Sequence, residues 1–256
     1  MTGNTVLRLD AVSKSFDGLR AVNDLSFEVK TGTITSLIGG NGAGKTTVFN
    51  LITGNLTPDA GHIYFRDSRV DGLPPHRVAR AGIARGFQEL RLFNRLSAHD
   101  NIEAAIPGQR GESLIRSLLG GRALRAESKM TSARSTALLR DLTMTAEANS
   151  LAERLSYGQQ KLLSLGRLLA SEGELLLLDE PTSGLNPNMV DDFCIRMRAL
   201  TQDSKTILLI EHNVDIVMRL SDWVVVMHQG AKIAEGKPDE IHNNVTVMHT
   251  YLGITS

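Results

Sequence analysis

The chain has one cysteine and no long apolar run, and both absences exclude classes of protein. Cys194 stands alone among 256 residues, so neither an intrachain disulfide nor a cysteine-based zinc site can form, and a reducing compartment suits the chain. Its neighbours Phe193 and Ile195 predict that the thiol packs in the core. No apolar run approaches the ~20 residues that span a bilayer, and the start MTGNTVLRLD lacks a basic leader. We therefore expect any membrane association to come through a partner.

The chain also lacks an excess of positive charge. Lys plus Arg equals Asp plus Glu at 28 each, so nothing in the overall balance concentrates phosphate backbone or anionic lipid. The densest basic segment has no interleaved aromatic residues that could stack on bases. It comprises Arg116, Arg122, Arg125, Lys129, Arg134 and Arg140. We interpret it as a solvated helical face and expect no nucleic-acid partner.

Apolar patterns along the chain predict an α/β fold. Alternating apolar residues in 6–9, 25–29 and 63–65 indicate a small strand-rich layer. The buried strands of a parallel sheet are expected at 33–38, 175–178, 207–210 and 224–227, with helices at 46–53 and near 190–200 and a helical region from about 96 to 170. The segment HQG followed by AKIAEG predicts a hairpin, and the stretch up to Tyr251 a helix.

A phosphate-binding loop is the first chemical motif. Residues 39–46 spell GGNGAGKT, which matches GxxxxGK[ST] between a predicted strand and a predicted helix. Glycines allow the backbone N–H groups to approach phosphate closely, and the helix N-terminus favours the anion. We expect Lys45 to neutralise the outer phosphates and the Thr46 hydroxyl to bind Mg²⁺. An ordinary glycine turn is the weaker alternative.

Two adjacent carboxylates follow the apolar run LLLL. Asp179 is expected to bind the metal, directly or through water, and Glu180 to act on the attacking water as general base or orienting group. An acidic pair after a strand is also typical of a solvent-facing strand end. The phosphate loop in the same chain favours the catalytic interpretation.

The segment LSYGQ, residues 155–159, resembles the signature of ABC ATPases, normally LSGGQ, and the resemblance covers nearly the whole chain. It implies that Ser156 and Gly158, with Tyr157 and Gln159 beside them, contact ATP bound by an opposite subunit, so that two copies sandwich each nucleotide. A helix N-terminus preceded by Ser is a good anion site, although the isolated string is equally a helix cap.

The resemblance assigns further roles in the expected order along the chain. Phe16 resembles the aromatic that stacks on adenine, although a lone Phe is more often in the core. Gln88 resembles the glutamine that reaches Mg²⁺ and the attacking water, although a lone Gln is usually on the surface. His212 resembles the switch histidine that contacts the terminal phosphate. The six other histidines show no ligand spacing and are expected to be structural or solvent-facing: His62, His76, His99, His228, His242 and His249.

Three positions depart from the family pattern. Asn186, in SGLN, stands where many members have Asp, which weakens the expected intersubunit contacts. Tyr157 replaces the first glycine of the signature, and Gly40 replaces a common proline of the phosphate loop. The loop groups expected to hold nucleotide are still present: Gly39, Gly40, Asn41, Gly42, Ala43, Gly44, Lys45, Thr46 and Thr47.

The resemblance implies one ABC ATPase domain over residues 1–256. Residues 1–95 and 171–256 are expected to form a P-loop NTPase core with a mostly parallel sheet and an antiparallel β layer, and residues 96–170 an inserted helical subdomain that carries the signature. Four parts of the chain most resemble ATP-binding subunits of bacterial branched-chain amino acid importers: GIARGFQELRLFNRLS, LSYGQQ, SGLNP and the ending AEGKPDEI...TYLG. The implied cofactors are ATP and Mg²⁺. The implied partners are a second ATPase subunit, identical or related, two membrane permeases and, indirectly, a periplasmic binding protein, with the chain peripheral on the cytoplasmic face of the inner membrane.

Alternative functions stay open at this point. A soluble ABC ATPase acting on ribosomes or DNA is disfavoured because the chain has one phosphate loop and no sustained heptads. An exporter ATPase shares the same motifs. A regulatory subunit without hydrolysis is disfavoured by Glu180 and His212.

Overall fold

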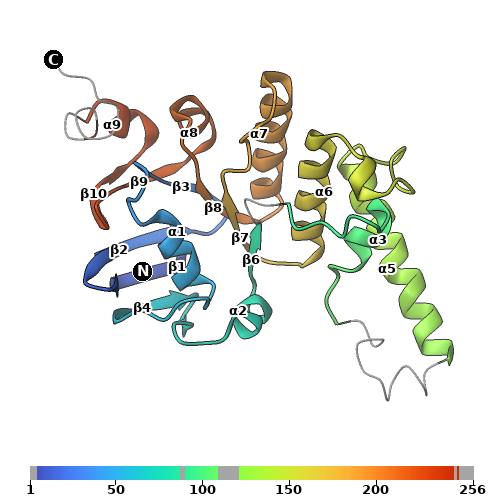
Figure 1. Ribbon diagram of the computed structural model, residues 1–256, viewed down its shortest axis with the longest axis horizontal. Coiled ribbons are helices and arrows are strands. Elements are labelled where there is room, and N and C mark those ends of the chain that lie inside the picture. The colour runs from blue at the N-terminus through green and yellow to red at the C-terminus, as the bar shows by residue number, and fades with distance from the viewer. Residues whose placement is uncertain (1–4, 87–89, 109–120, 245–246, 248–256) are drawn as a thin grey trace. The chain divides into compact units, whose positions relative to one another are not determined.

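The computed structural model describes residues 5–86, 90–108, 121–244 and 247, and the chain divides into two compact units (Figure 1). Unit 1 comprises Met1–Arg85 and Glu174–Ser256, and unit 2 comprises Gly86–Gly173. The predicted Gln88, Arg116, His249 and Tyr251 lie outside the described residues.

Unit 1 holds the two sheets and the helices that cover them. The chain runs β1 (Thr5–Phe16), β2 (Leu19–Lys30), β3 (Ile34–Gly39), α1 (Lys45–Ile52), β4 (Ala60–Phe65), β5 (Ser68–Arg69), α2 (Pro75–Ala81) and β6 (Ile83–Gly86), which ends at the unit boundary. It returns with β7 (Leu175–Asp179), α7 (Pro187–Gln202), β8 (Thr206–Ile210), α8 (Val214–Leu220), β9 (Trp223–His228), β10 (Ala231–Gly236) and α9 (Pro238–His242).

The two sheets have different topologies, as the sequence predicts. The larger sheet has the order β10-β9-β3-β8-β7-β6, and β3 pairs in parallel with β8 and β9 while β7 pairs in parallel with β8. Its edge strand β10 is antiparallel to β9, which confirms the predicted hairpin. The smaller sheet, β2-β1-β4-β5, is antiparallel. The predicted α/β class with a mostly parallel sheet and an antiparallel layer is confirmed.

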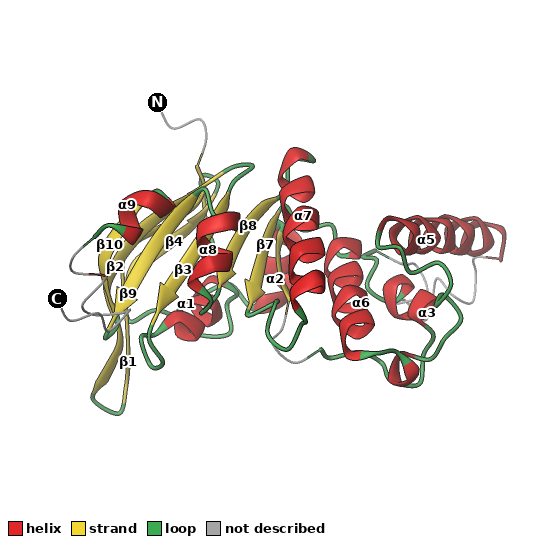
Figure 2. Cartoon of the chain, turned by 90° about the horizontal axis from the view of Figure 1, so that it is seen from above, coloured by secondary structure: helices red, strands yellow, loops and turns green. Residues whose placement is uncertain are grey.

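Helix α1 fills the space between the two sheets (Figures 1 and 2). Its Val48, Phe49 and Leu51 are buried in one cluster with residues of both sheets. Strand β9 shows the period-2 geometry of a strand covered on both faces, because Val225 packs in this cluster and Val224 packs in a second cluster with α8 and α9. The phosphate loop is therefore attached to a strand and a helix that are both buried.

Unit 2 is helical in its described part. It contains α3 (Ala98–Glu103), α5 (Gly121–Asp141), a 3₁₀ turn (Ala152–Arg154) and α6 (Tyr157–Ala170). The helices pack closely at Gly166 of α6, where an added β-carbon would lie 2.7 Å from Leu142 and 2.9 Å from Ile102. No described helix combines the length and the apolarity that crossing a membrane requires.

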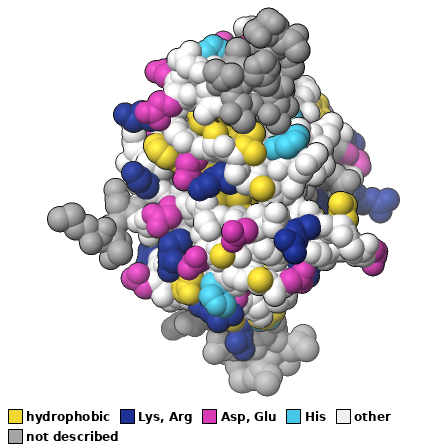
Figure 3. Space-filling model, turned by 90° about the vertical axis from the view of Figure 1, so that its left-hand side faces the viewer, with side chains coloured by type: hydrophobic (Ala, Val, Ile, Leu, Met, Phe, Trp, Pro, Cys, Tyr) yellow, Lys and Arg dark blue, Asp and Glu magenta, His cyan; other side chains and the backbone are white. Residues whose placement is uncertain are grey.

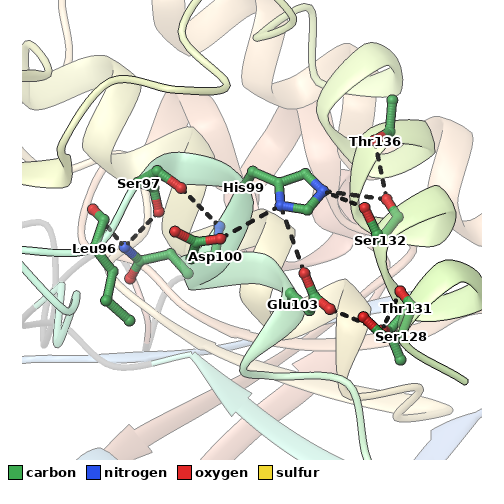
Figure 4. A network of polar contacts seen from close by, with 10 residues as sticks. Leu96, Ser97, His99, Asp100, Glu103, Ser128, Thr131, Ser132 and Thr136 are labelled. Carbon is green, nitrogen blue, oxygen red and sulfur yellow. Dashed lines mark hydrogen bonds and ion pairs between the residues drawn. The ribbon is translucent and has the colours of Figure 1, made fainter. Parts of the chain in front are cut away.

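A polar network joins α3 to α5 (Figure 4). Nε2 of His99 lies 3.2 Å from both the carbonyl oxygen and the hydroxyl of Ser132, and Nδ1 lies 3.6 Å from a carboxylate oxygen of Asp100 and of Glu103. Thr131 Oγ1 also donates to Glu103 at 2.8 Å. The ligand atoms of His99, Asp100 and Glu103 lie within 4.8 Å of one another, although the spacing of the histidines in the sequence does not indicate a ligand group. Both ring nitrogens face protein groups, as a structural link between two helices requires.

Two further expectations concern side chains outside the site. Cys194 is 7% exposed, so the prediction that it packs in the core is confirmed, and burial raises the pKa of its thiol. In the basic segment, Lys129 and Arg140 of α5 are exposed, whereas Arg134 is half-buried and forms an ion pair with Glu172. Figure 3 shows one side of the molecule, on which basic and acidic side chains are interspersed.

Candidate functional site

The phosphate loop lies between the end of β3 and the start of α1, in the context that the sequence predicts. At two of its glycines a side chain is excluded both by a steric clash and by the backbone angle φ. Gly44 has a φ of 98°, and a β-carbon there would lie 2.2 Å from the carbonyl oxygen of Ala21. At Gly39 a β-carbon would lie 2.3 Å from the carbonyl oxygen of Met227. Gly40 has open space around it. The loop is thus fixed at its two ends and unconstrained at Gly40.

Lys45 lies at the first position of α1 and its ammonium turns back to the loop. Nζ donates to the carbonyl oxygens of Gly39 at 2.8 Å and Gly40 at 3.0 Å. Burial lowers the pKa of Lys45, and the charges of Glu180 and Asp179 oppose that shift. The cation is therefore held at the mouth of the loop beside the two predicted carboxylates.

A cavity of about 620 Å³ opens over the loop, a size typical of ligand sites. It brings together residues that are far apart in sequence. They are Leu19, Arg20, Ala21, Asn41, Gly42, Ala43, Gly44, Lys45, Thr46, Thr47, Glu180, Ile210, His212 and Gln229. A second cavity, of about 650 Å³, lies at the amino end of β3 near Thr33 and Trp223 and contains no residue of the phosphate loop.

Asp179 is the last residue of β7 and is 6% exposed. Burial raises the pKa of its carboxyl, with Glu180 acting in the same direction and Arg85 against it. The Arg85 guanidinium lies 3.4 Å from an Asp179 carboxylate oxygen and donates to Asn50 Oδ1 at 2.6 Å. The carboxylate of Asp179, which is buried, and the hydroxyl of Thr46, which is exposed, are oxygen donors of the kind that Mg²⁺ prefers, so these residue types fit that ion.

Glu180 and His212 meet across the ends of two neighbouring parallel strands. Nε2 of His212 lies 2.5 Å from Oε1 of Glu180. Glu180 has a φ of 48°, in the left-handed region that is unusual for a residue with a β-carbon. Its backbone N–H donates to the carbonyl oxygen of Ile210 at 2.9 Å. Glu180, His212 and Lys45 all line the same cavity.

The signature-like segment lies at the start of α6, in unit 2. Ser156 caps the helix, because its side chain accepts from Gln159 N at 3.4 Å while Ser156 N donates to Gln159 Oε1 at 2.9 Å. Ser156 and Tyr157 are exposed, and Gly158 is buried. Lys161 Nζ lies 5.6 Å from the centre of the Tyr157 ring. The tip of this helix therefore presents a hydroxyl and an aromatic ring to solvent.

Two other predicted residues have defined surroundings. Phe16 is 42% exposed at the end of β1, where it pairs with Leu19, and Lys14 Nζ lies 5.7 Å from its ring centre. Asn186 caps α7, since its side chain accepts from Met189 N at 3.0 Å. Asp is an equally good cap, so the start of the helix is formed equally well with Asn at this position.

The cavity contains residues that the motifs did not single out. Leu19, Arg20 and Ala21 come from the start of β2, and Gln229 comes from the turn between β9 and β10. The turn is tied to the loop because Gly230 N donates to Ala43 O at 3.1 Å. No short motif marks these residues, since long-range contacts bring them to the site.

A parallel sheet, a glycine loop leading into a buried helix, and an acidic strand end define a P-loop nucleotide-binding domain. A family model for "ABC transporter" matches residues 22–183, which include the phosphate loop, LSYGQ and both carboxylates. The chain belongs to the ABC transporter family as an ATP-binding ATPase cassette.

The similarity to relatives and to solved structures extends over almost the full chain. The high-affinity branched-chain amino acid transport ATP-binding protein BraF of Pseudomonas aeruginosa is 37% identical, covering 97% of this chain and 98% of the relative. LivG of Salmonella typhimurium, which carries the same description, is 39% identical with the same coverage. A nucleotide-free ATP-binding cassette from an ABC transporter superposes with a TM-score of 0.83 at 30% identity, covering 98% of this chain and all of that one. A second cassette structure, in an ADP conformation, gives the same score and identity.

Proposed function

We propose that this chain hydrolyses MgATP to drive an importer of branched-chain or related amino acids. The single observation that carries the ATPase part is the cavity in which the phosphate loop, Lys45 and the Glu180–His212 pair meet. The substrate class is supported by relatives that are described as branched-chain amino acid transport ATP-binding proteins.

In this proposal the groups of unit 1 bind and orient the triphosphate. The loop amides and the α1 N-terminus bind the phosphate oxygens, and Lys45 exchanges the carbonyls of Gly39 and Gly40 for the outer phosphates. Phe16 and its neighbour Leu19 contact the adenine. Thr46, Asp179 and, outside the described residues, Gln88 hold Mg²⁺, which neutralises charge on the phosphates when bound.

The same proposal gives Glu180 and His212 the chemical step. Glu180 orients the attacking water or accepts its proton, and His212 holds the Glu180 carboxylate and contacts the terminal phosphate. Because phosphoryl transfer depends mainly on positioning and on charge stabilisation, the short contact between these side chains is a direct part of the catalytic arrangement.

Unit 2 supplies the other half of a shared site. We propose that it is the helical subdomain and that Ser156, Tyr157, Gly158 and Gln159 face the nucleotide of a second ATPase subunit, identical or related. The exposed cap of α6 supports this role, since a helix N-terminus with a Ser cap suits an anion. The remaining partners in the proposal are two membrane permeases and, indirectly, a periplasmic binding protein, with the chain peripheral on the cytoplasmic face of the inner membrane.

Substitution of Glu180 by Gln tests the catalytic assignment. We expect Glu180→Gln to keep ATP affinity within about twofold while phosphate release falls by roughly 10²-fold or more, because the amide cannot accept the water's proton. Titration with labelled ATP and a phosphate-release assay measure the two quantities. Glu28→Gln, at an exposed carboxylate of β2, is the control and should behave as wild type. Near-normal hydrolysis by Glu180→Gln would refute the assignment.

Uptake in cells tests the transport role. A strain that lacks this gene should lose uptake of labelled leucine, isoleucine and valine, and wild type but not Glu180→Gln should restore it. The chain should also co-purify with membrane permeases. Co-purification with ribosomes or DNA together with unchanged uptake would instead support a soluble ABC ATPase, and export of a labelled compound would support an exporter.

A further inference from the structure

Glu211 lies between the two catalytic segments of unit 1, and no motif in the sequence singles it out. It follows the last residue of β8, directly before His212, and is 4% exposed. Strand β8 pairs in parallel with β7, and Asp179 at the end of β7 is aligned with Ile210. The side chain of Glu211 is therefore buried where the segment with Glu180 and the segment with His212 begin.

The Glu211 carboxylate accepts hydrogen bonds from both segments. Oε1 accepts a short bond from the Thr182 hydroxyl and a second bond from Thr182 N at 3.3 Å. Oε2 accepts from the backbone N–H of His212 at 3.2 Å. Thr182 lies two residues after Glu180. The buried Glu211 side chain therefore connects the segment that carries Glu180 to the backbone of His212.

We infer that Glu211 is a positioning residue that holds Glu180 and His212 at their mutual distance. The inference rests on the roles proposed for that pair. Glu180 adopts an unfavourable backbone angle, and such a residue keeps its conformation only where the surroundings fix it. The bond from Glu180 N to Ile210 O fixes the residue from one side, and the bonds from Thr182 to Glu211 fix the segment that follows.

The chemistry of the contact requires a carboxylate. All three partners of Glu211 donate, and an ionised carboxylate accepts only, so every contact is satisfied. A glutamine at 211 has the same size but only one accepting oxygen. Its NH₂ group would face either the Thr182 donors or the His212 N–H, and two donors cannot form a hydrogen bond with each other. One segment would then move, and a displacement of about 1 Å at a catalytic group costs on the order of 10²-fold in rate.

Steady-state kinetics with matched variants test this role. We expect Glu211→Gln to lower kcat by about 10- to 100-fold while the affinity for ATP stays within about twofold, because the phosphate loop is untouched. Thr182→Val removes the hydroxyl and should lower kcat in the same way to a smaller extent. Thr182→Ser keeps the hydroxyl and should restore near-wild-type turnover. Since both residues act through one contact, the double variant Glu211→Gln, Thr182→Val should lose less than the product of the two single losses.

Ser221→Ala is the control for the loss of a buried hydrogen bond elsewhere in unit 1. Ser221 is 5% exposed and its hydroxyl lies 2.6 Å from that of Ser36, away from the cavity. The Ser221→Ala variant should have the kcat of wild type even where its melting temperature falls as much as that of Glu211→Gln. The inference is overturned if Glu211→Gln retains wild-type kcat. It is also overturned if Thr182→Val and Thr182→Ser have the same kcat, and this second comparison remains decisive if Glu211→Gln does not fold. A wild-type chain that releases no phosphate would contradict the proposed function itself, whereas active wild type with active Glu211→Gln contradicts only the role of Glu211.

Discussion

Gly40 and Gly44 lie four residues apart in the phosphate loop, yet their surroundings differ. The region around Gly40 is open, and its φ is not in the left-handed range. Gly44 has a φ of 98° and lies against the carbonyl oxygen of Ala21, from the start of β2. The residue type at position 44 is therefore dictated by a strand that the motif does not include, and the family's proline at position 40 is compatible with the open space there.

The two glycines provide a matched pair of substitutions. Gly44→Ala should reduce ATP affinity at least about tenfold and destabilise the chain by roughly 1 to 3 kcal/mol, because the new methyl group cannot fit beside Ala21. Gly40→Ala should change both quantities little. Nucleotide titration and thermal unfolding measure the effects. Equal losses in the two variants would show that loop flexibility, rather than contact with β2, decides the outcome.

Asp179 illustrates the cost of burying a carboxylate. Its raised pKa means that the native chain holds this proton more tightly than the unfolded chain. The corresponding stability is present in acid, below the unfolded pKa of about 3.9, and is lost as the pH rises through the folded pKa. Ionisation of this buried carboxyl therefore destabilises the fold.

Replacing Asp179 by Asn should remove that penalty. We expect Asp179→Asn to melt roughly 2 to 4 °C higher than wild type at pH 7.5, about 1 kcal/mol for a domain of this size, with the gain shrinking toward pH 4. Arg85 keeps Asn50 as an acceptor in the variant. The same substitution should weaken Mg²⁺-dependent ATP binding. Asp203→Asn, at an exposed residue, serves as control. A lower melting temperature for Asp179→Asn at neutral pH would show that the Arg85 contact outweighs burial.

At the scale of elements, α3 is short and depends on hydrogen bonds for its position. Asn101 is fully buried and its side chain bonds to Phe93, Leu96 and Ser97 in the segment that precedes the helix. Ser97 caps α3 by accepting from Asp100 N at 3.0 Å. A helix of six residues has little stability of its own, so these contacts and the network of Figure 4 fix it against α5.

Loss of the Asn101 amide should loosen unit 2 locally. We expect Asn101→Ala to cost about 2 to 3 kcal/mol, because backbone groups of Phe93 and Ser97 lose a buried partner. Hydrogen exchange should become faster in residues 90–106 and stay unchanged around α1. Asn243→Ala, an exposed asparagine with one bond to Asp239 O, is the control. Uniformly faster exchange in both units would mean that the chain unfolds as a whole instead.

The elements also show how far the sequence alone leads. The strand and helix around the phosphate loop, the β9–β10 hairpin and the acidic end of β7 were predictable, because each is encoded by local periodicity or by a motif. The contributions of Ala21, Gln229 and Glu211 were not. The positions of these three residues depend on the pairing of strands that are distant in the sequence, and the role of Glu211 depends on which buried donors need an acceptor. No short sequence pattern predicts either.

For the whole molecule, the proposal requires a site shared between two chains. Lys45 lies in unit 1 and Ser156 in unit 2, so a substitution at either should inactivate a homodimer. A mixture of Lys45→Ala and Ser156→Arg proteins should nevertheless regain hydrolysis. The mixed dimer pairs the intact loop of one chain with the intact helix tip of the other, giving at most about a quarter of wild-type activity if the sites act independently.

Mixing the two inactive proteins and measuring phosphate release provides the test. Each protein alone should remain inactive at the same total concentration, and the recovered activity should peak at an equal ratio. A mixture that stays inactive would argue that the working pair is this chain with a different, related subunit, or that no nucleotide is shared.

The resting position of Lys45 has a consequence for speed. Its ammonium already donates to the carbonyl oxygens of Gly39 and Gly40, so the charge is positioned before nucleotide binds. Binding of a triphosphate then exchanges one set of acceptors for another and requires no folding of the loop. Capture of nucleotide should then be limited by diffusion and orientation, with residence time setting the affinity.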